Sequence, residues 1–190
     1  MEFTGNTGVN VGNLSRVEFT KKSNGRFVID ETNWHQDPRW HEQFKKIAPG
    51  LRHIYITGGE PMLVPFHNEM LEYLVETGLS NNIVMEYDTN LTAIHKRALD
   101  LWKHFKKVWL RISIDDFGDQ FEYIRYPARW QQISKNVETL SKEMSNIKMD
   151  FTVTWQVLSA YTTPNLIDYF EQFDKHNSSV RILSSPDYFD

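Results

Sequence analysis

Four consecutive residues, Gly58-Gly59-Glu60-Pro61, follow a strand-like run at 53–57 and combine residue types that can hold a ligand. Two glycines without Cβ atoms let a ligand lie directly against backbone amides, and the Glu60 carboxylate can accept hydrogen bonds from a cationic group such as an ammonium. Pro61 fixes the chain direction and withholds a donor. The same residues also suit a tight loop with a solvated carboxylate, so their neighbours must decide between the two interpretations.

Polar residues also follow, or lie within, the next three strand-like runs. They are Asp88, Thr89 and Asn90 after the second run, Arg111, Ser113, Asp115 and Asp116 along or after the third, and Thr154 and Gln156 in the fourth. In parallel α/β sheets, ligands bind at the carboxyl ends of the strands. We therefore expect these side chains to converge with Glu60 on one mouth of the sheet.

The elements that must position these residues alternate between strand and helix. Runs rich in β-branched and aromatic residues at 53–57, 82–87, 107–115, 150–158 and 180–183 predict strands. Repeated strand and helix order predicts βαβ units with right-handed crossovers, and hence an α/β fold with a parallel sheet. Asn24-Gly25, between two apolar stretches, predicts a small hairpin before this region.

Helical periodicity fills the segments between the predicted strands. The clearest segment spaces its apolar residues three or four apart, at Trp130, Ile133, Val137, Leu140 and Met144. Other helices are predicted before Gly78, which suits a left-handed cap, within 92–105, and after Asp37-Pro38 and Thr163-Pro164, which are typical helix starts.

Composition and charge exclude several classes of protein. The chain has 190 residues and no cysteine, so it has no disulfide, no thiolate nucleophile and no cysteine-ligated metal of its own. A net charge of −4 does not indicate a nucleic-acid partner. No apolar run is long enough for a membrane span and no secretion signal is evident, so we expect a cytoplasmic protein.

Four stretches together resemble the radical S-adenosylmethionine (radical SAM) superfamily, and more narrowly its twitch-domain members, which have a shortened accessory region. They are "TGGEP", "DTNLT", "RISID" and "YIRYPARWQQISKNVETL". The likeness runs from about Trp40 to the end of the chain, in the order and at the spacing of the family. "GGEP" at a strand end is its most specific element.

The resemblance implies a partial (β/α)6 TIM-like barrel of parallel strands that binds S-adenosylmethionine (SAM) for reductive cleavage to a 5′-deoxyadenosyl radical. It places Gly58, Gly59, Glu60 and Pro61 at the methionine amino group, Thr89 and Asn90 near the ribose and sulfonium, Ser113 and Asp115 at the ribose or methionine carboxylate, and Arg125 at that carboxylate. Alternatively, Arg125 is an ordinary surface arginine, and Asp115 and Asp116 cap a loop.

The sequence departs from the family in two respects. Members ligate a 4Fe-4S cluster through three cysteines after the first barrel strand, whereas this chain has none and its predicted strands begin with the second. We therefore expect a piece of a longer protein, with an N-terminal extension at 1–35 and a barrel core at 36–190 that is truncated at both ends. A natural remnant is the alternative. In either case the cluster belongs to the full-length parent only, no catalytic or metal-ligating residue is assigned here, and the isolated chain should be inactive.

Other functions and partners stay open. A non-catalytic α/β binding or interaction domain derived from the same fold is the main alternative. The strand at 53–57 has an apolar edge that invites a homodimer, unless the predicted hairpin covers it. The seven histidines lack metal-site spacing, the aromatic residues fit core packing better than base stacking, and Glu60 would repel a phosphate. No motif positions an acid and base pair such as Asp115 and Asp116 for hydrolysis, and the substrate is unknown.

Overall fold

The computed structural model describes the backbone of residues 9–10, 16–17, 19–21 and 27–29, and describes residues 38–173 and 176–182 with their side chains. The chain divides into two compact units, 1–42 and 43–190.

The first unit contains two antiparallel strand pairs. β1 (Val9–Asn10) pairs with β2 (Arg16–Val17), and β3 (Phe19–Lys21) pairs with β4 (Phe27–Ile29). The β3 and β4 pair is the hairpin predicted around Asn24-Gly25, whose turn lies outside the described residues. The helix α1 (Pro38–Ile47) begins at the predicted Pro38 and continues into the second unit.

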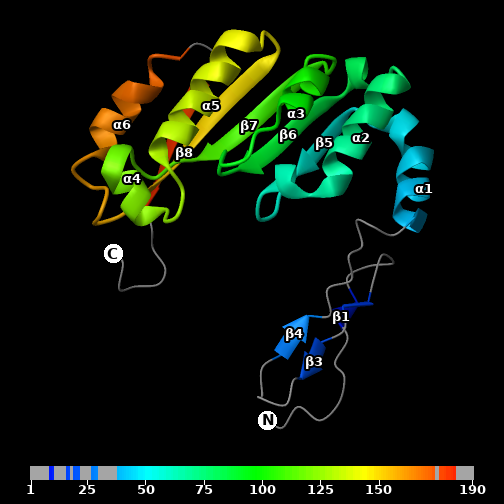
Figure 1. Ribbon diagram of the computed structural model, residues 1–190, viewed down its shortest axis with the longest axis horizontal. Coiled ribbons are helices and arrows are strands. Elements are labelled where there is room, and N and C mark those ends of the chain that lie inside the picture. Colours follow the sequence, from blue (N-terminus) through cyan, green and yellow to red (C-terminus); the bar gives the residue numbers. More distant parts are fainter. Residues whose placement is uncertain are drawn as a thin grey trace. The chain divides into compact units, whose positions relative to one another are not determined.

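The second unit is built on one sheet of five parallel strands (Figure 1). Their order is β5 (His53–Ile56), β6 (Val84–Thr89), β7 (Lys107–Ser113), β8 (Ile147–Trp155) and β9 (His176–Ile182). Strand order follows chain order, as successive crossovers of one hand require. The predicted α/β fold, a partial TIM-like barrel of parallel strands, is therefore confirmed, and its sheet is not closed.

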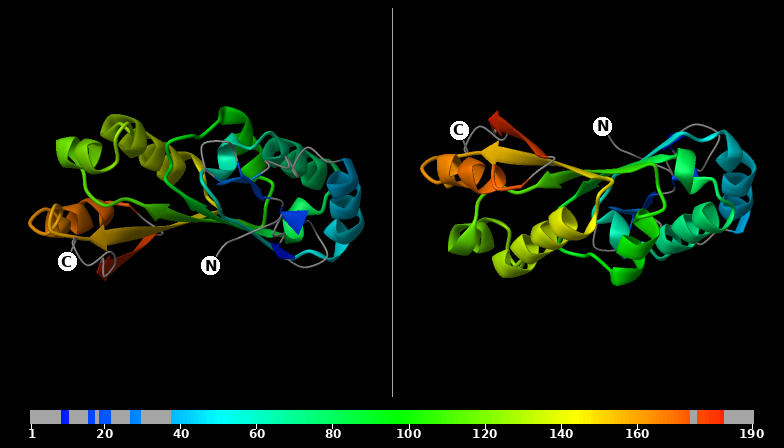
Figure 2. Two further views of the ribbon diagram at one scale, coloured as in Figure 1. Left: turned by 90° about the horizontal axis from the view of Figure 1, so that it is seen from below. Right: turned by 90° about the horizontal axis from the view of Figure 1, so that it is seen from above.

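Helices connect the strands and lie on one face of this sheet (Figures 1 and 2). They are α2 (Pro65–Glu76), α3 (Lys96–Trp102), α4 (Gly118–Ile124), α5 (Trp130–Glu143) and α6 (Thr163–Phe170), with 3-10 turns at Ala48–Gly50, Pro61–Leu63 and Ser80–Asn82. Gly78 ends α2 with φ of 72°, the left-handed conformation predicted for it. No helix in the described ranges is long and apolar enough to span a membrane.

The core lies between the helices and the helix-covered face of the sheet. Its strand residues alternate along the chain, as in β8, where Met149, Phe151 and Val153 are fully buried. Phe151 stacks on Phe170 of α6 with ring centroids 4.0 Å apart. The core therefore takes every second strand residue and leaves the others on the opposite face.

A polar cluster is buried in this core beneath β6. The Trp102 indole N–H donates to the Tyr87 hydroxyl at 3.1 Å, and the same hydroxyl lies 2.9 Å from Nε2 of His67. The indole can only donate, so the Tyr87 hydroxyl accepts this bond, while the tautomer of the neutral His67 ring sets the direction of the other. Burial lowers the pKa of His67 to about 4 and raises the pKa of Tyr87.

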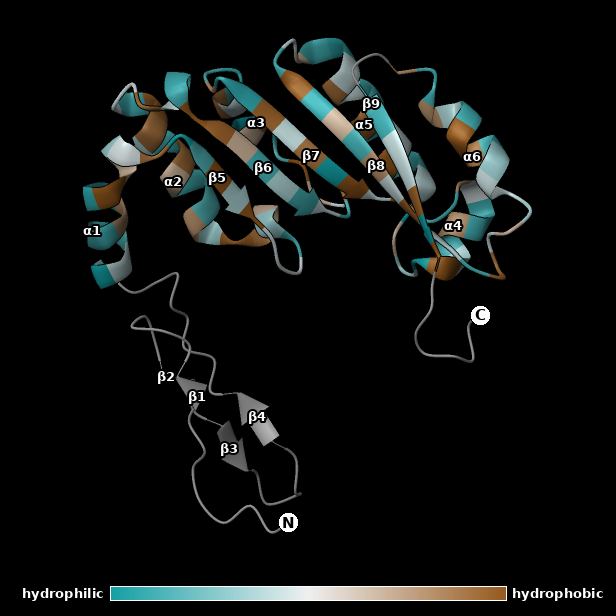
Figure 3. Ribbon diagram, turned by 180° about the vertical axis from the view of Figure 1, so that it is seen from behind, coloured by the Kyte–Doolittle hydropathy of each residue, from teal (hydrophilic) through white to brown (hydrophobic). Residues whose placement is uncertain are grey.

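On the opposite face of the sheet, charged residues pair with one another across strands. Figure 3 views the strands from this side, with their hydrophilic residues in teal. Glu86 of β6 lies 2.7 Å from His53 of β5 and 3.2 Å from Arg111 of β7. Arg111 in turn lies 2.8 Å from Asp88, which also accepts hydrogen bonds from the hydroxyls of Tyr55 and Thr57. These side chains form a network of ion pairs and hydrogen bonds across three strands.

Candidate functional site

The Gly58-Gly59 loop leaves β5 at the carboxyl edge of the sheet and leads directly to Glu60. Gly58 has φ of 149°, a value that residues other than glycine rarely adopt. A Cβ added at Gly58 or Gly59 would meet no other atom within 4 Å, so the space above both residues is open. Pro61 then begins a 3-10 turn and, like Met62, is buried, which anchors the far side of the loop.

The Glu60 carboxylate is fixed against the end of β6. The Thr89 hydroxyl lies 2.8 Å from Oε1 and 2.9 Å from Oε2, and the Asn90 backbone N–H donates to Oε2 at 3.1 Å. Burial raises the pKa of Glu60, while the bonds from Thr89, Asn90 and the Met62 backbone act in the opposite direction. The adjacent strand ends thus hold a half-buried carboxylate in one orientation.

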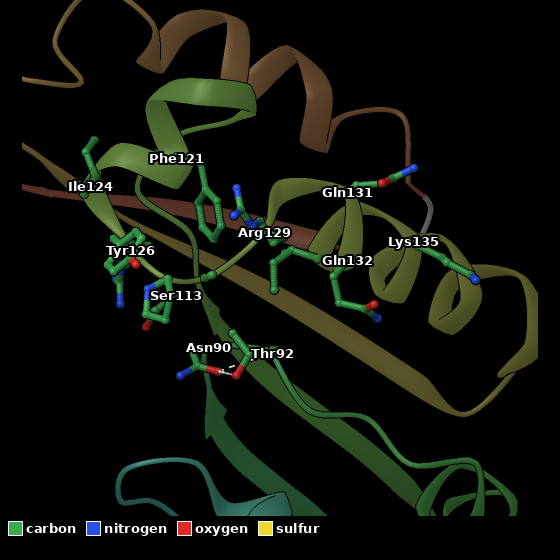
Figure 4. A pocket seen from close by; sticks show the side chains of 14 residues that line it. Asn90, Thr92, Ser113, Phe121, Ile124, Tyr126, Arg129, Gln131, Gln132 and Lys135 are labelled. Carbon is green, nitrogen blue, oxygen red and sulfur yellow. Dashed lines mark hydrogen bonds between the residues drawn. The ribbon is translucent and has the colours of Figure 1, made fainter.

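A hollow of about 1030 Å³ lies beside these strand ends (Figure 4). Its walls come from the ends of β6 and β7, from α4 and its following loop, and from the first turns of α5. The lining residues are Asn90, Thr92, Ser113, Phe121, Ile124, Arg125, Tyr126, Pro127, Ala128, Arg129, Gln131, Gln132, Ile133 and Lys135. Three of them are basic and none is acidic, and two of the three, Arg125 and Arg129, pair with carboxylates outside the lining.

Three of the predicted site residues line this hollow and offer polar groups to it. The Asn90 side-chain oxygen accepts from the backbone N–H and hydroxyl of Thr92, at 3.0 and 2.6 Å, while its amide nitrogen bonds no described residue. The Ser113 hydroxyl likewise has no partner in the described part of the chain. Arg125 uses Nε toward Asp115, and its two Nη nitrogens bond none of the described side chains.

Asp115 and Asp116 are buried and serve other parts of the protein. Asp115 accepts from Arg125 Nε at 2.5 Å and from the Thr154 backbone N–H at 3.0 Å, which joins β7, α4 and β8. Asp116 accepts from the Phe117 N–H at 2.8 Å and from the Thr162 hydroxyl at 2.6 Å. Both carboxylates therefore hold the carboxyl edge together, and Asp115 fixes the orientation of Arg125.

The structure gathers the predicted residues at one edge of the sheet in two layers. Asn90, Ser113 and Arg125 line the hollow, Glu60 lies outside its lining and accepts a hydrogen bond from the Asn90 backbone, and Thr89 and Asp115 are buried. The predicted contact of each with a cofactor stays a prediction. Residues 38–173 and 176–182 contain no cluster of His, Cys, Asp or Glu that could hold a metal.

Sequence reasoning missed the basic wall formed by Arg129 and Lys135. Arg129 precedes α5 and pairs with Glu122 at 2.6 Å, and Lys135 lies one and a half turns further on. The available signal was that Lys135 falls on the polar side of the amphipathic helix predicted from Trp130 onward, whereas Arg129 lies just before that helix. Only the placement of α4 against α5 shows that they share one cavity.

Comparison with known proteins gives a family and several similar solved structures. The Radical SAM superfamily model matches residues 30–158. Crystal structures of SuiB from Streptococcus suis are similar with a TM-score of 0.57 at 16% identity, covering 77% of this chain and 34% of theirs. The structure of SuiB bound to S-adenosylmethionine has a TM-score of 0.56 at 15% identity and covers 80% of this chain and 35% of its own. The structure of SuiB bound to precursor peptide SuiA has a TM-score of 0.54 at 17% identity and covers 85% of this chain and 35% of its own. The chain thus spans about a third of the length of these proteins, and no curated protein matches its sequence.

Proposed function

The chain belongs to the radical SAM superfamily, and from this premise we propose that its carboxyl edge binds S-adenosylmethionine. Glu60 accepts the methionine ammonium, the Arg125 Nη pair binds the methionine carboxylate, and Asn90 and Ser113 contact the ribose. The observation that carries the proposal is the fixed carboxylate of Glu60 beside a hollow that offers a guanidinium, an amide and a hydroxyl.

The residues present fit this ligand in space and in charge. The open space above Gly58 and Gly59 gives a ligand access to backbone amides next to Glu60. An α-amino acid carries an ammonium and a carboxylate on neighbouring atoms. Glu60, which bonds the Asn90 backbone, and Arg125, which lines the same hollow as Asn90, offer the opposite charges. An ammonium would also compensate a carboxylate that burial otherwise disfavours.

The residues do not fit the iron–sulfur cluster of the superfamily, because the chain contains no cysteine. SAM supplies a 5′-deoxyadenosyl radical when it is reductively cleaved, and that step needs the missing cluster. The part of this chain in the reaction is therefore to bind and orient SAM, and we propose that it is inactive by itself. If it binds no SAM, the non-catalytic binding or interaction domain becomes the better assignment.

Isothermal titration calorimetry with SAM tests the proposal. Wild-type chain should bind SAM, and Glu60→Gln should bind it about 10- to 150-fold more weakly, because a hydrogen bond to a charged group is worth about 1.5–3 kcal/mol. Methylthioadenosine, which lacks the amino acid head, should bind both proteins equally. Glu76→Gln, at an exposed position near the end of α2, is the matched control and should leave SAM affinity unchanged.

Two results would contradict the proposal. One is equal SAM affinity in wild type and Glu60→Gln, which would remove the ammonium contact. The other is an affinity of wild type for methylthioadenosine as high as for SAM, because the charged head would then contribute nothing.

A further inference from the structure

The side chain of Thr89 is directed at Glu60 and away from solvent. The residue is only 3% exposed. Its hydroxyl oxygen accepts the Leu91 backbone N–H at 2.9 Å. A hydroxyl has a single proton, and both Glu60 oxygens lie within 2.9 Å, so that proton is shared between them.

The turn that follows Thr89 is itself held in an unusual conformation. Leu91 is fully buried and has φ of 59°, the left-handed region that residues other than glycine seldom adopt. Its N–H is bonded by Thr89, and its carbonyl accepts from the Asn136 side chain of α5 at 2.9 Å. Strained backbone of this kind persists where the surrounding structure over-determines it, often at functional sites.

The turn serves to aim two donors at one carboxylate. With Leu91 bent back, the Asn90 N–H and the Thr89 hydroxyl both point to Glu60. In the described part of the chain no charged side chain bonds Glu60. Asp88, the adjacent carboxylate on β6, lies on the opposite face, where it pairs with Arg111, Tyr55 and Thr57. Neutral donors alone therefore stabilise the ionised form of Glu60.

We propose that Thr89 is a positioning residue of the cofactor site, whose hydroxyl keeps the Glu60 carboxylate ionised and oriented toward a ligand ammonium. This inference rests on the proposed function only for the identity of the ligand. The effect on Glu60 belongs to the free protein, and it can be measured without SAM.

The first experiment follows the Glu60 side-chain carboxyl by carbon-13 NMR from acid to neutral pH, with Glu60→Gln used to assign its signal. Thr89→Val removes the hydroxyl and keeps the shape, so the Glu60 titration should move to higher pH. Thr89→Ser keeps the hydroxyl and should titrate like wild type. Thr77→Val, an exposed threonine at the end of α2, is the matched control and should change nothing. An unchanged Glu60 titration in Thr89→Val overturns the inference.

The second experiment measures SAM affinity against pH in the same variants. Thr89→Val should bind SAM about two- to tenfold more weakly at pH 7.5, and its loss of affinity on acidification should begin at higher pH than in wild type. A purely structural role of Thr89 would lower affinity without moving this pH profile, and that outcome also overturns the inference. Should wild type bind no SAM, the proposed function fails, while the NMR titration still decides whether Thr89 controls Glu60. If Thr89→Val does not fold, Thr89→Ala removes the same hydroxyl with less bulk.

Discussion

Replacing Leu91 by alanine and by glycine measures the strain stored at the carboxyl edge. Either substitution removes a fully buried side chain and should cost about 2–5 kcal/mol of unfolding free energy. Alanine at φ of 59° keeps the left-handed penalty of about 1–2 kcal/mol, whereas glycine does not have it. Glycine elsewhere is about 1 kcal/mol less favourable than alanine. The difference predicts that Leu91→Gly is as stable as Leu91→Ala or up to about 1 kcal/mol more stable.

Urea unfolding followed by tryptophan fluorescence provides the comparison, since the chain contains six tryptophans. Ala98→Gly is the control, because Ala98 is fully buried within α3 at an ordinary helical position. It should cost about 1 kcal/mol. If glycine at position 91 is less stable than alanine by as much as it is at position 98, the backbone is not strained there, and the reasoning about the turn is refuted.

Three further predictions concern the core. Tyr87→Phe leaves a buried indole N–H and imidazole nitrogen without their shared partner and should cost about 1–3 kcal/mol in urea unfolding, whereas the exposed control Tyr126→Phe should cost nothing measurable. His67 has a pKa of about 4 in the folded protein and 6.5 when unfolded, so the unfolding free energy should fall by about 3 kcal/mol as the pH drops from 6.5 to 4. His67→Gln should reduce this dependence of unfolding free energy on pH. An unchanged slope in His67→Gln would contradict the prediction. Asn136→Ala should cost about 1–3 kcal/mol by leaving the Leu91 carbonyl unpaired, and a change below about 0.5 kcal/mol in chemical denaturation would show that water replaces the amide.

Much of the fold could be predicted because its signals are local. The apolar spacing of α5 marks a helix whatever it packs against, and Ile133, Val137 and Leu140 are all buried as predicted. Predictions failed where tertiary pairing overrides local preference. β9 begins at His176, four residues before the predicted start, because the polar run before Val180 continues the ladder with β8. α4 was not predicted, and Thr162 rather than Thr163 occupies the N-cap position of α6.

The position of the candidate site could be predicted, but which of its residues are buried and which line the hollow was harder to predict. Strand ends carry the polar residues at one edge, as the parallel sheet requires. Which of them are buried depends on strand phase: Thr89 falls on the same face as Tyr87 and Met85, a period-2 signal that was available in the sequence. The pairing of Asp115 with Arg125 depends on how α4 packs, which no spacing reveals. The twitch-domain subtype, the location in the cell and a homodimer through the β5 edge stay predictions.

The self-paired charges on the open face of the sheet have a consequence for how such a protein can diversify. Glu86 and Asp88 both pair with Arg111 without any contribution from the helices that build the core. Substituting both partners of an ion pair there, rather than one residue, should change the polarity of that surface while the apolar face still determines the fold. The charged face of the five strands should therefore tolerate substitution, while the apolar face supports the fold.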